Sequence, residues 1–167
     1  MRQHFLLILL LLSIAYTTST LAQTQPQPTS GKELQASIKQ RHQMMEQSLL
    51  RGYPVRNIGP VIQGGRIVDI EVAMPDVHTY YVAYASGGVF KTTNNGVSFD
   101  PVFDNQGALT IGDIALAPSD PATIYVGTGE NNSSRSSNAG SGLYKSGDAG
   151  ASWSYLGLGS IQHTGRI

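Results

Sequence analysis

Short runs of alternating apolar and polar residues, separated by turn-forming residues, occupy the chain from residue 66 onward. In a first stretch these runs lie at Arg66–Ala73, Tyr80–Tyr84, Val89–Thr92 and Phe99–Phe103. A period of two is typical of strands that turn one face toward a core, and the Gly, Pro, Asn and Asp residues between the runs favour tight turns. The pattern therefore predicts four strands joined one after another.

The same succession recurs in a second stretch, with runs at Ile111–Ala117, Thr123–Gly127, Gly142–Lys145 and Trp153–Leu156. Asp-Ile and Tyr-Val pairs return at matching places, which indicates an internal repeat. Four strands in about 45 residues is the size of one propeller blade. We therefore expect an all-β fold, with two four-stranded blades of an incomplete β-propeller at residues 53–108 and 109–163.

Each predicted blade carries a degenerate Asp-box, a short turn motif that reads TTNNGVSF in the first copy and SGDAGASW in the second. Hydroxyl and carboxylate side chains in such a turn bond its backbone, and glycine accepts the positive φ that the turn needs. Asn94 stands where the second copy has Asp148, so we interpret the motif as a structural brace and not as a catalytic group. Its structural positions are Thr92, Asn94, Gly96, Phe99, Ser146, Asp148, Gly150 and Trp153.

The first residues have the pattern of a signal peptide. A short basic start precedes an apolar run, Phe5–Ala15, that is too short for a comfortable membrane span. Small residues before Ala22 predict cleavage after that residue, so residues 1–22 are expected to be removed. The mature chain is then expected to be secreted or periplasmic, with no membrane span.

A tether and a helix are predicted at residues 23–52. Ser30 and Glu33 have the spacing of a capping box at a helix N-terminus. Four apolar residues are predicted to share one helical face, and Gly52 and Pro54 to end the helix. The apolar residues are Leu34, Ile38, Met45 and Leu49. This helix either binds a partner or packs as a strut on the outside of the blades.

Composition excludes several functions. The sequence has 11 Lys and Arg against 11 Asp and Glu, with no basic patch, so nucleic acid is not an expected partner. It has no cysteine, which rules out disulfides, thiol nucleophiles and cysteine-based metal sites. No histidine spacing and no phosphate-loop motif suggest a metal or cofactor, so we expect neither.

The last residues, Thr164–Ile167, repeat the residues Gly64–Ile67 and predict the start of a third blade. We therefore expect further blades of the same longer chain, the alternative being several short chains that assemble one ring. Two blades alone would expose apolar rows on their outer faces. The residues expected in those rows are Ile70, Val72, Leu116 and Val126.

The second copy contains a polar insertion, Glu130–Asn138, directly after a predicted strand. Loops at strand ends carry the binding sites of many folds, so the insertion is either a ligand site or a solvated loop. The candidate ligand-binding residues are Glu130, Asn131, Asn132 and Arg135, and Glu130 is also the candidate catalytic carboxylate. Tyr144 and Tyr155 are the aromatic residues expected nearby. Arg66 either binds an acidic ligand or pairs with an Asp of the neighbouring blade.

Four segments resemble a known family of large secreted bacterial proteins with sortilin-type and BNR (Asp-box) repeats, described as glycosyl-hydrolase-like or xyloglucanase-like propellers. The segments are NIGPVIQGGRIVDIEV (Asn57–Val72), ASGGVFKTTNNGVSF (Ala85–Phe99), APSDPATIYVGTGENN (Ala117–Asn132) and GLYKSGDAGASW (Gly142–Trp153). The resemblance implies more blades, in tandem propellers, and further C-terminal domains. It implies a fold more strongly than an activity.

The resemblance also offers a residue test for hydrolysis. Propeller xyloglucanases carry a catalytic Asp in a Thr-Asp-x-Gly-Gly setting, and here Tyr84 and Ala85 stand at the Thr and Asp positions. Alanine cannot transfer a proton. Three functions stay open: a module that binds carbohydrate or peptide through strand-end loops, a xyloglucanase-like glycoside hydrolase with catalytic acids mostly outside this sequence, and a protein-interaction scaffold.

Overall fold

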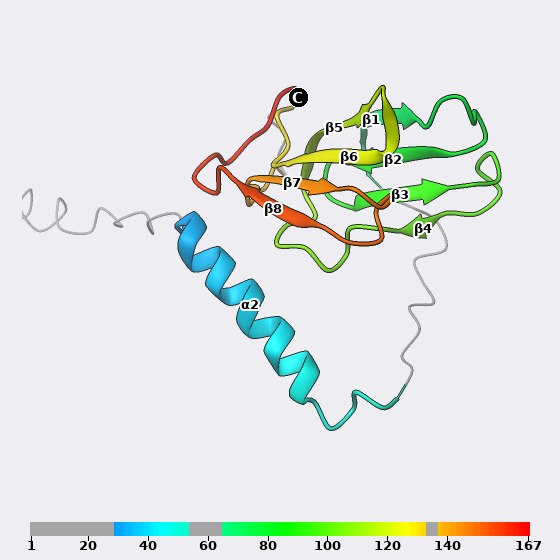
Figure 1. Ribbon diagram of the computed structural model, residues 1–167. Helices are drawn as coiled ribbons and strands as arrows, with labels where there is room; N and C mark the ends of the chain where they lie inside the picture. Colours follow the sequence, from blue (N-terminus) through cyan, green and yellow to red (C-terminus); the bar gives the residue numbers. More distant parts are fainter. Residues whose placement is uncertain (1–28, 54–64, 133–136) are drawn as a thin grey trace, which may run out of the picture.

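The computed structural model describes residues 29–53, 65–132 and 137–167 (Figure 1). The predicted signal peptide and its cleavage site, most of the tether, and Arg135 lie outside the described residues. Within the described part, no helix is both long enough and apolar enough to span a membrane.

The first sheet is an antiparallel meander in which each strand pairs with the next. Its strands are β1 (Ile67–Val72), β2 (Tyr80–Tyr84), β3 (Gly88–Thr92) and β4 (Asp100–Pro101). The last strand is shorter than the predicted Phe99–Phe103. Proline has no amide hydrogen to donate to a ladder, which suits Pro101 to the end of a short edge strand.

The second sheet repeats this order. Its strands are β5 (Ile111–Ala117), β6 (Asp120–Thr128), β7 (Leu143–Ser146) and β8 (Ser154–Gly157). The two four-stranded sheets confirm the predicted all-β class and the predicted repeat. Both sheets have the size and up-and-down order of propeller blades.

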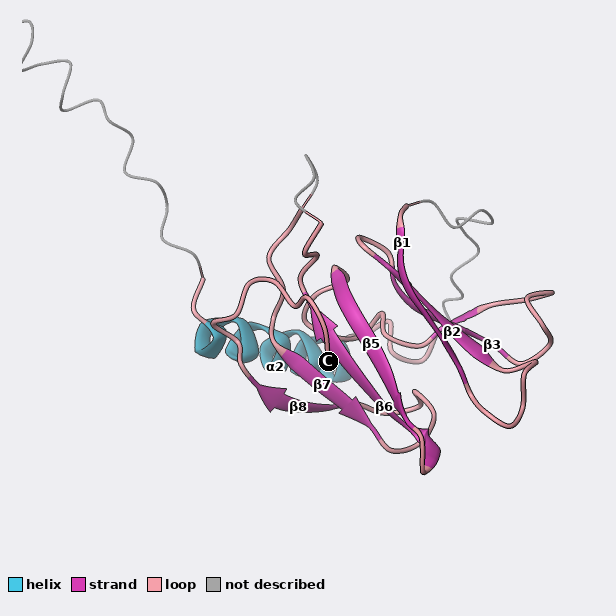
Figure 2. Ribbon diagram, turned by 90° about the horizontal axis from the view of Figure 1, so that it is seen from above, coloured by secondary structure: helices cyan, strands magenta, loops and turns pink. Residues whose placement is uncertain are grey.

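The two sheets stack face to face, with β5 next to β1 and β2 (Figure 2). We call the side with the cross-strand row Ile70, Val82 and Phe90 the front of the first sheet, and the opposite side its back. The equivalent front row of the second sheet is Ile114, Val126 and Tyr144. The core joins the front of the second sheet to the back of the first, through Tyr81, Ala83 and Val89 with Ile114, Ile124, Val126 and Tyr144.

This front-to-back stacking corrects one prediction about exposed apolar rows. Ile70 and Val72 are exposed at 51% and 40%, as predicted. Val126 is fully buried and Leu116 packs against the core, contrary to prediction. The reason is that these two residues lie on the front of the second sheet, which the first sheet covers.

Phe103 is buried at the outer end of the interface between the two sheets. It follows β4, is fully buried, and meets the rings of Tyr144 and Trp153 edge to face at centroid distances of 5.3 and 5.0 Å. The Trp153 indole Nε1 donates a hydrogen bond of 2.7 Å to the Val102 carbonyl oxygen. The segment after the first sheet is therefore built into the core of the second.

Helix α2 (Gly31–Gln47) begins as predicted, because Ser30 and Glu33 form a complete capping box. It ends at Gln47 instead of near Gly52. Ser48 is extended, and its hydroxyl accepts a hydrogen bond of 3.1 Å from the Leu50 amide, a local bond that competes with further helix. Leu49 therefore lies beyond the helix and is 98% exposed, so its predicted place on the apolar face is wrong.

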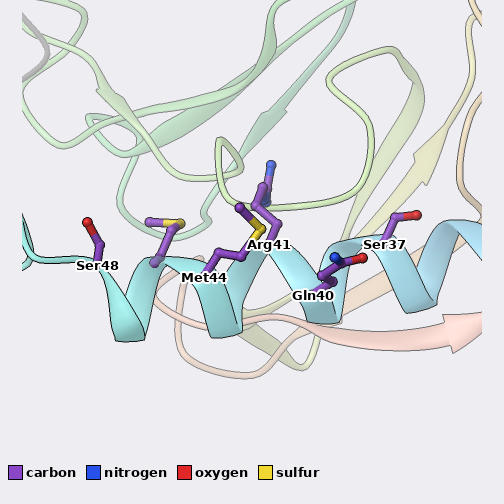
Figure 3. A pocket seen from close by; sticks show the side chains of 6 residues that line it. Ser37, Gln40, Arg41, Met44 and Ser48 are labelled. Carbon is purple, nitrogen blue, oxygen red and sulfur yellow. The ribbon is translucent and has the colours of Figure 1, made fainter.

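The helix contacts the connection between the sheets and the second sheet through a few side chains. Arg41 donates to the Asn105 carbonyl oxygen, and Gln35 donates to the Tyr144 hydroxyl at 3.4 Å. Around Arg41 the helix surface forms a shallow hollow, lined by Ser37, Gln40, Arg41, Met44, Met45 and Ser48 (Figure 3). No residue of the helix is buried. Both predicted roles, a partner-binding helix and a strut on the outside of the blades, stay predictions.

Candidate functional site

The stacked sheets have two chemically different ends. The loops after β2 and β6 lie at one end, together with the starts of β1 and β5, and we call this the insertion end. The two Asp-box turns, between β3 and β4 and between β7 and β8, lie at the other, which we call the Asp-box end.

Glu130 lies at the insertion end. It follows β6 and is only 1% exposed. The Arg66 Nε donates a bond of 2.9 Å to the Glu130 Oε1, and the Arg66 Nη2 contacts the same oxygen. The Ser137 hydroxyl donates to Oε2 at 3.4 Å. The alternative that the insertion is a solvated loop is therefore wrong for Glu130.

The ion pair of Arg66 and Glu130 joins the start of the first sheet to the end of a strand in the second. The partner expected for Arg66 was an Asp, and the structure provides a Glu at that place. Both Glu130 carboxylate oxygens accept bonds from protein groups. A buried carboxylate held in this way acts as a brace between the sheets.

The C-terminal segment covers the same strand end. Its Thr164 amide donates to the Gly129 carbonyl oxygen at 2.9 Å, and the His163 Nδ1 lies 2.7 Å from the Glu130 carbonyl oxygen. Gly129 has a φ of 90°, and a Cβ there would lie 1.9 Å from the Gln162 carbonyl oxygen. This close approach requires glycine.

The other predicted ligand residues are less constrained. Asn131 and Asn132 are exposed and follow Glu130 directly. Tyr144, one of the two expected aromatic residues, is 2% exposed, and its hydroxyl lies 2.8 Å from the Ser141 hydroxyl. Tyr144 is therefore a core residue, whereas Tyr155 is 36% exposed.

A pocket of about 290 Å³ opens at the insertion end, between the two sheets. It is lined by Ser86, Gly107, Ala108, Leu109, Thr110, Asn138 and Ala139. The polar lining consists of hydroxyl and amide groups, and Ala108, Leu109 and Ala139 supply an apolar lining of similar extent. Sequence reasoning missed Ser86, although the turn after β2 is the repeat equivalent of the insertion after β6.

Three carboxylates, those of Asp69, Glu71 and Asp113, lie near one another where strands β1 and β5 meet. The Asp69 Oδ2 accepts a bond of 3.4 Å from the Ile114 amide, and the Asp113 Oδ2 accepts one of 2.7 Å from the Ile167 amide. Asp69 in the first sheet thus binds the backbone of the second sheet, and Asp113 in the second sheet binds the backbone of the C-terminal segment. The signal that could have found them is an Asp at the same place inside a strand in both copies.

The acids at this junction influence one another. Burial raises the pKa of Asp113, and the charge of the nearby Asp69 carboxylate adds to the shift, whereas the Ile167 amide and the Arg166 guanidinium oppose it. Burial also raises the pKa of Glu71, with further contributions from Asp69 and Asp113.

Replacing Asp113 by asparagine is expected to raise the thermal midpoint at neutral pH. Because the pKa of Asp113 is raised in the fold, the folded state binds more protons than the unfolded chain above pH about 3.9, and stability falls as the pH rises through this window. Asparagine keeps an acceptor for the Ile167 amide and does not ionise. Melting curves at acidic and neutral pH test this: an equal change in midpoint at both would contradict it.

The Asp-box turns have the hydrogen bonds that the motif predicts. In the second turn the Ser146 hydroxyl donates to the Asp148 Oδ1 at 2.7 Å and accepts from the Gly150 amide at 2.9 Å. In the first turn the Thr92 hydroxyl donates to the Asn94 Oδ1 at 3.0 Å and accepts from the Gly96 amide at 2.9 Å. The side-chain amide of Asn94 and the carboxylate of Asp148 therefore accept equivalent hydrogen bonds in the two turns.

Replacing Asp148 by asparagine is expected to remove an acid-dependent part of the stability. Hydrogen bonds from the Ser152 hydroxyl and amide, and from Ser146, lower the pKa of Asp148 to about 2. A carboxyl with a depressed pKa stabilises the fold above pH about 3.9 and loses this contribution as the pH falls through about 2. Denaturant titrations at a series of acidic pH values should show a flatter profile for the variant.

The first turn provides the matched control for this prediction. Replacing Asn94 by aspartate should add an acid-dependent part of the stability where the natural residue has none. An unchanged pH profile in both variants would contradict the assignment of the acid response to this position.

Among the described residues, no group of three or more His, Asp or Glu side chains is placed to hold a metal ion. No family model matches the chain, and no curated protein matches it.

Solved structures similar to this chain include two GH74 enzymes. One is an ancestral GH74 enzyme, 21% identical with a TM-score of 0.46, and the match covers 60% of this chain and 14% of that one. The other is the GH74 xyloglucanase from Xanthomonas campestris, 19% identical with a TM-score of 0.41, covering 53% and 15%. Structural similarity at this low identity and TM-score does not support an inference about activity. The class defined by the structure itself is an all-β protein of two repeated, stacked four-stranded sheets.

Proposed function

We propose that this chain is a secreted or periplasmic β-propeller repeat module that binds a carbohydrate at its insertion end. The observation that carries the proposal is the pocket between the Ser86 turn and the Asn138 segment. Its hydroxyl and amide groups match the donors and acceptors of a sugar, and its volume suits one sugar unit. A peptide is the alternative ligand, and would make the chain an interaction scaffold.

An ion pair and backbone hydrogen bonds hold the residues around the pocket in place, which favours specific binding. The ion pair of Arg66 and Glu130 joins the two sheets next to it, and the Gly129 amide donates to the Thr110 carbonyl oxygen at 2.7 Å. The Gly88 amide donates to the Leu109 carbonyl oxygen at 2.8 Å. Groups held by the scaffold in this way lose little conformational entropy when a ligand binds.

Titration of the isotope-labelled chain with cello-, xylo- and manno-oligosaccharides, followed by NMR, tests the proposal. We expect saturable shifts at Ser86, Thr110 and Asn138. Replacing Ser86 by tyrosine should weaken binding at least about tenfold, because a ring would fill the mouth of the pocket. The matched control is Ser98→Tyr in the exposed first Asp-box turn, which should leave binding unchanged.

The other outcomes of this titration are informative. Saturation by unstructured peptides, and not by sugars, would favour the interaction scaffold. Release of reducing sugar during the titration would favour the glycoside hydrolase instead. Shifts that do not saturate, or that map to residues outside the pocket, would contradict the proposed site.

A further inference from the structure

The pocket at the insertion end has an apolar wall beside its polar groups. Ala108, Leu109 and Ala139 form this wall, and Leu109 is 42% exposed. The Gly88 amide donates to the Leu109 carbonyl oxygen at 2.8 Å, and a Cβ at Gly88 would lie 3.4 Å from the Leu109 Cδ2. The glycine therefore lets the leucine side chain lie close to the start of β3. Leu109 is held in place while part of its side chain stays open to a ligand.

The polar groups of the pocket suit the hydroxyl groups of a sugar. The Thr110 hydroxyl donates to the Ala139 carbonyl oxygen at 3.3 Å, so toward a ligand it acts as an acceptor. The Ser86 side chain is exposed, and its hydroxyl both donates and accepts. Because each hydroxyl of a sugar is also both a donor and an acceptor, one sugar unit satisfies Ser86 and Thr110 together.

The apolar wall is too small for the whole face of a sugar ring. In the part of the chain that the structure describes, no aromatic residue lines the pocket, so the wide apolar surface of an aromatic ring is missing. Two alanines and part of one leucine match a methyl group in size. A methyl group against this wall leaves water and favours binding. A hydroxyl group in the same place loses its bonds to water and finds no polar partner on the wall.

We propose that the pocket selects a sugar unit that carries a methyl group, with this methyl group against Leu109 and the sugar hydroxyls near Ser86 and Thr110. The inference rests on the proposed carbohydrate-binding function and names the class of sugar. Two kinds of sugar supply such a methyl group, the 6-deoxyhexoses on C6 and the acetamido sugars on the acetyl group. Unmodified hexoses place a hydroxyl or hydroxymethyl group at the wall and bind more weakly.

NMR titration of the isotope-labelled full chain with matched pairs of free sugars tests this selection. The first arm compares L-fucose with L-galactose and L-rhamnose with L-mannose, and each of these pairs differs only in the hydroxyl on C6. The second arm compares N-acetyl-D-glucosamine with D-glucose. In one arm we expect the methyl-bearing sugar to bind at least about fivefold more tightly than its parent, with saturable shifts at Leu109 and Thr110. The arm that shows the preference identifies the source of the methyl group.

A pair of leucine variants tests whether the wall is the cause. Leu109→Thr keeps a branched side chain but adds a hydroxyl, and it should reduce the preference for the methyl-bearing sugar to less than about twofold. The matched control is Leu156→Thr in β8, where the leucine is 48% exposed and does not line the pocket. This control should keep the full preference. Thermal melting followed by circular dichroism checks that both variants are folded.

The failures of the two proposals are distinguishable. Saturable binding at the pocket with equal affinity inside every pair would overturn the methyl selection and leave the carbohydrate-binding module standing. A preference that Leu109→Thr retains would overturn the assignment to this wall. The absence of saturable shifts with every sugar would overturn both the selection and the proposed function.

Discussion

Replacing Phe103 by alanine is expected to destabilise the protein by about 3 to 5 kcal/mol, because it removes a fully buried ring and leaves a cavity. The ring touches both Tyr144 and Trp153, so its loss also removes two edge-to-face contacts. Phe103 belongs to the connection between the sheets, and the interface depends on it although it lies in no strand. Denaturant unfolding followed by circular dichroism measures the change.

Phe90 provides the matched control for this experiment. It lies on the front of the first sheet and is only partly buried, with Tyr84 as its ring partner at 5.5 Å. The same Phe-to-Ala change there should cost about 1 kcal/mol. Equal losses for the two variants would show that Phe103 has no special place in the interface.

Replacing Arg66 by methionine is expected to destabilise the protein by about 3 to 5 kcal/mol, because it leaves the Glu130 carboxylate buried without its cation. The two partners differ in exposure, since the Arg66 side chain is 46% exposed and the Glu130 side chain is fully buried. Removing the arginine should therefore cost more than replacing Glu130 by glutamine, which leaves the guanidinium access to water.

Two further variants test this explanation by denaturant unfolding. The double variant Arg66→Met with Glu130→Gln should recover part of the stability, because no buried charge remains. Arg51 lies outside both sheets and is exposed, so Arg51→Met should change stability by no more than about 0.5 kcal/mol. A double variant as unstable as Arg66→Met alone would contradict the explanation.

The Asp-box turns show why local features could be predicted well. The bonds from Thr92, Asn94, Ser146 and Asp148 reach only two to four residues along the chain. The capping box of α2 is local in the same way. Strands β2 and β5 begin and end at the predicted residues, because alternation and flanking turns specify them. Interactions this short in sequence are encoded by the segment itself.

The candidate site depends on contacts that local patterns do not contain. Glu130 was recognised as a carboxylate at a strand end, but its pairing with Arg66 joins residues that are far apart in sequence. The pocket combines the Ser86 turn with the Asn138 segment for the same reason. Helix α2 was located correctly at its start, and its end differed because Ser48 bonds to the backbone after it.

The sequence by itself determined a repeated four-stranded unit, its turns and the alternation of faces along each strand. The tertiary structure alone decided that the front of the second sheet packs on the back of the first, which buries Val126 and leaves Ile70 exposed. A period of two states which residues share a face, but it does not state which face is covered. That choice depends on how two distant segments meet, and with it the positions of Glu130, Phe103 and the pocket were decided.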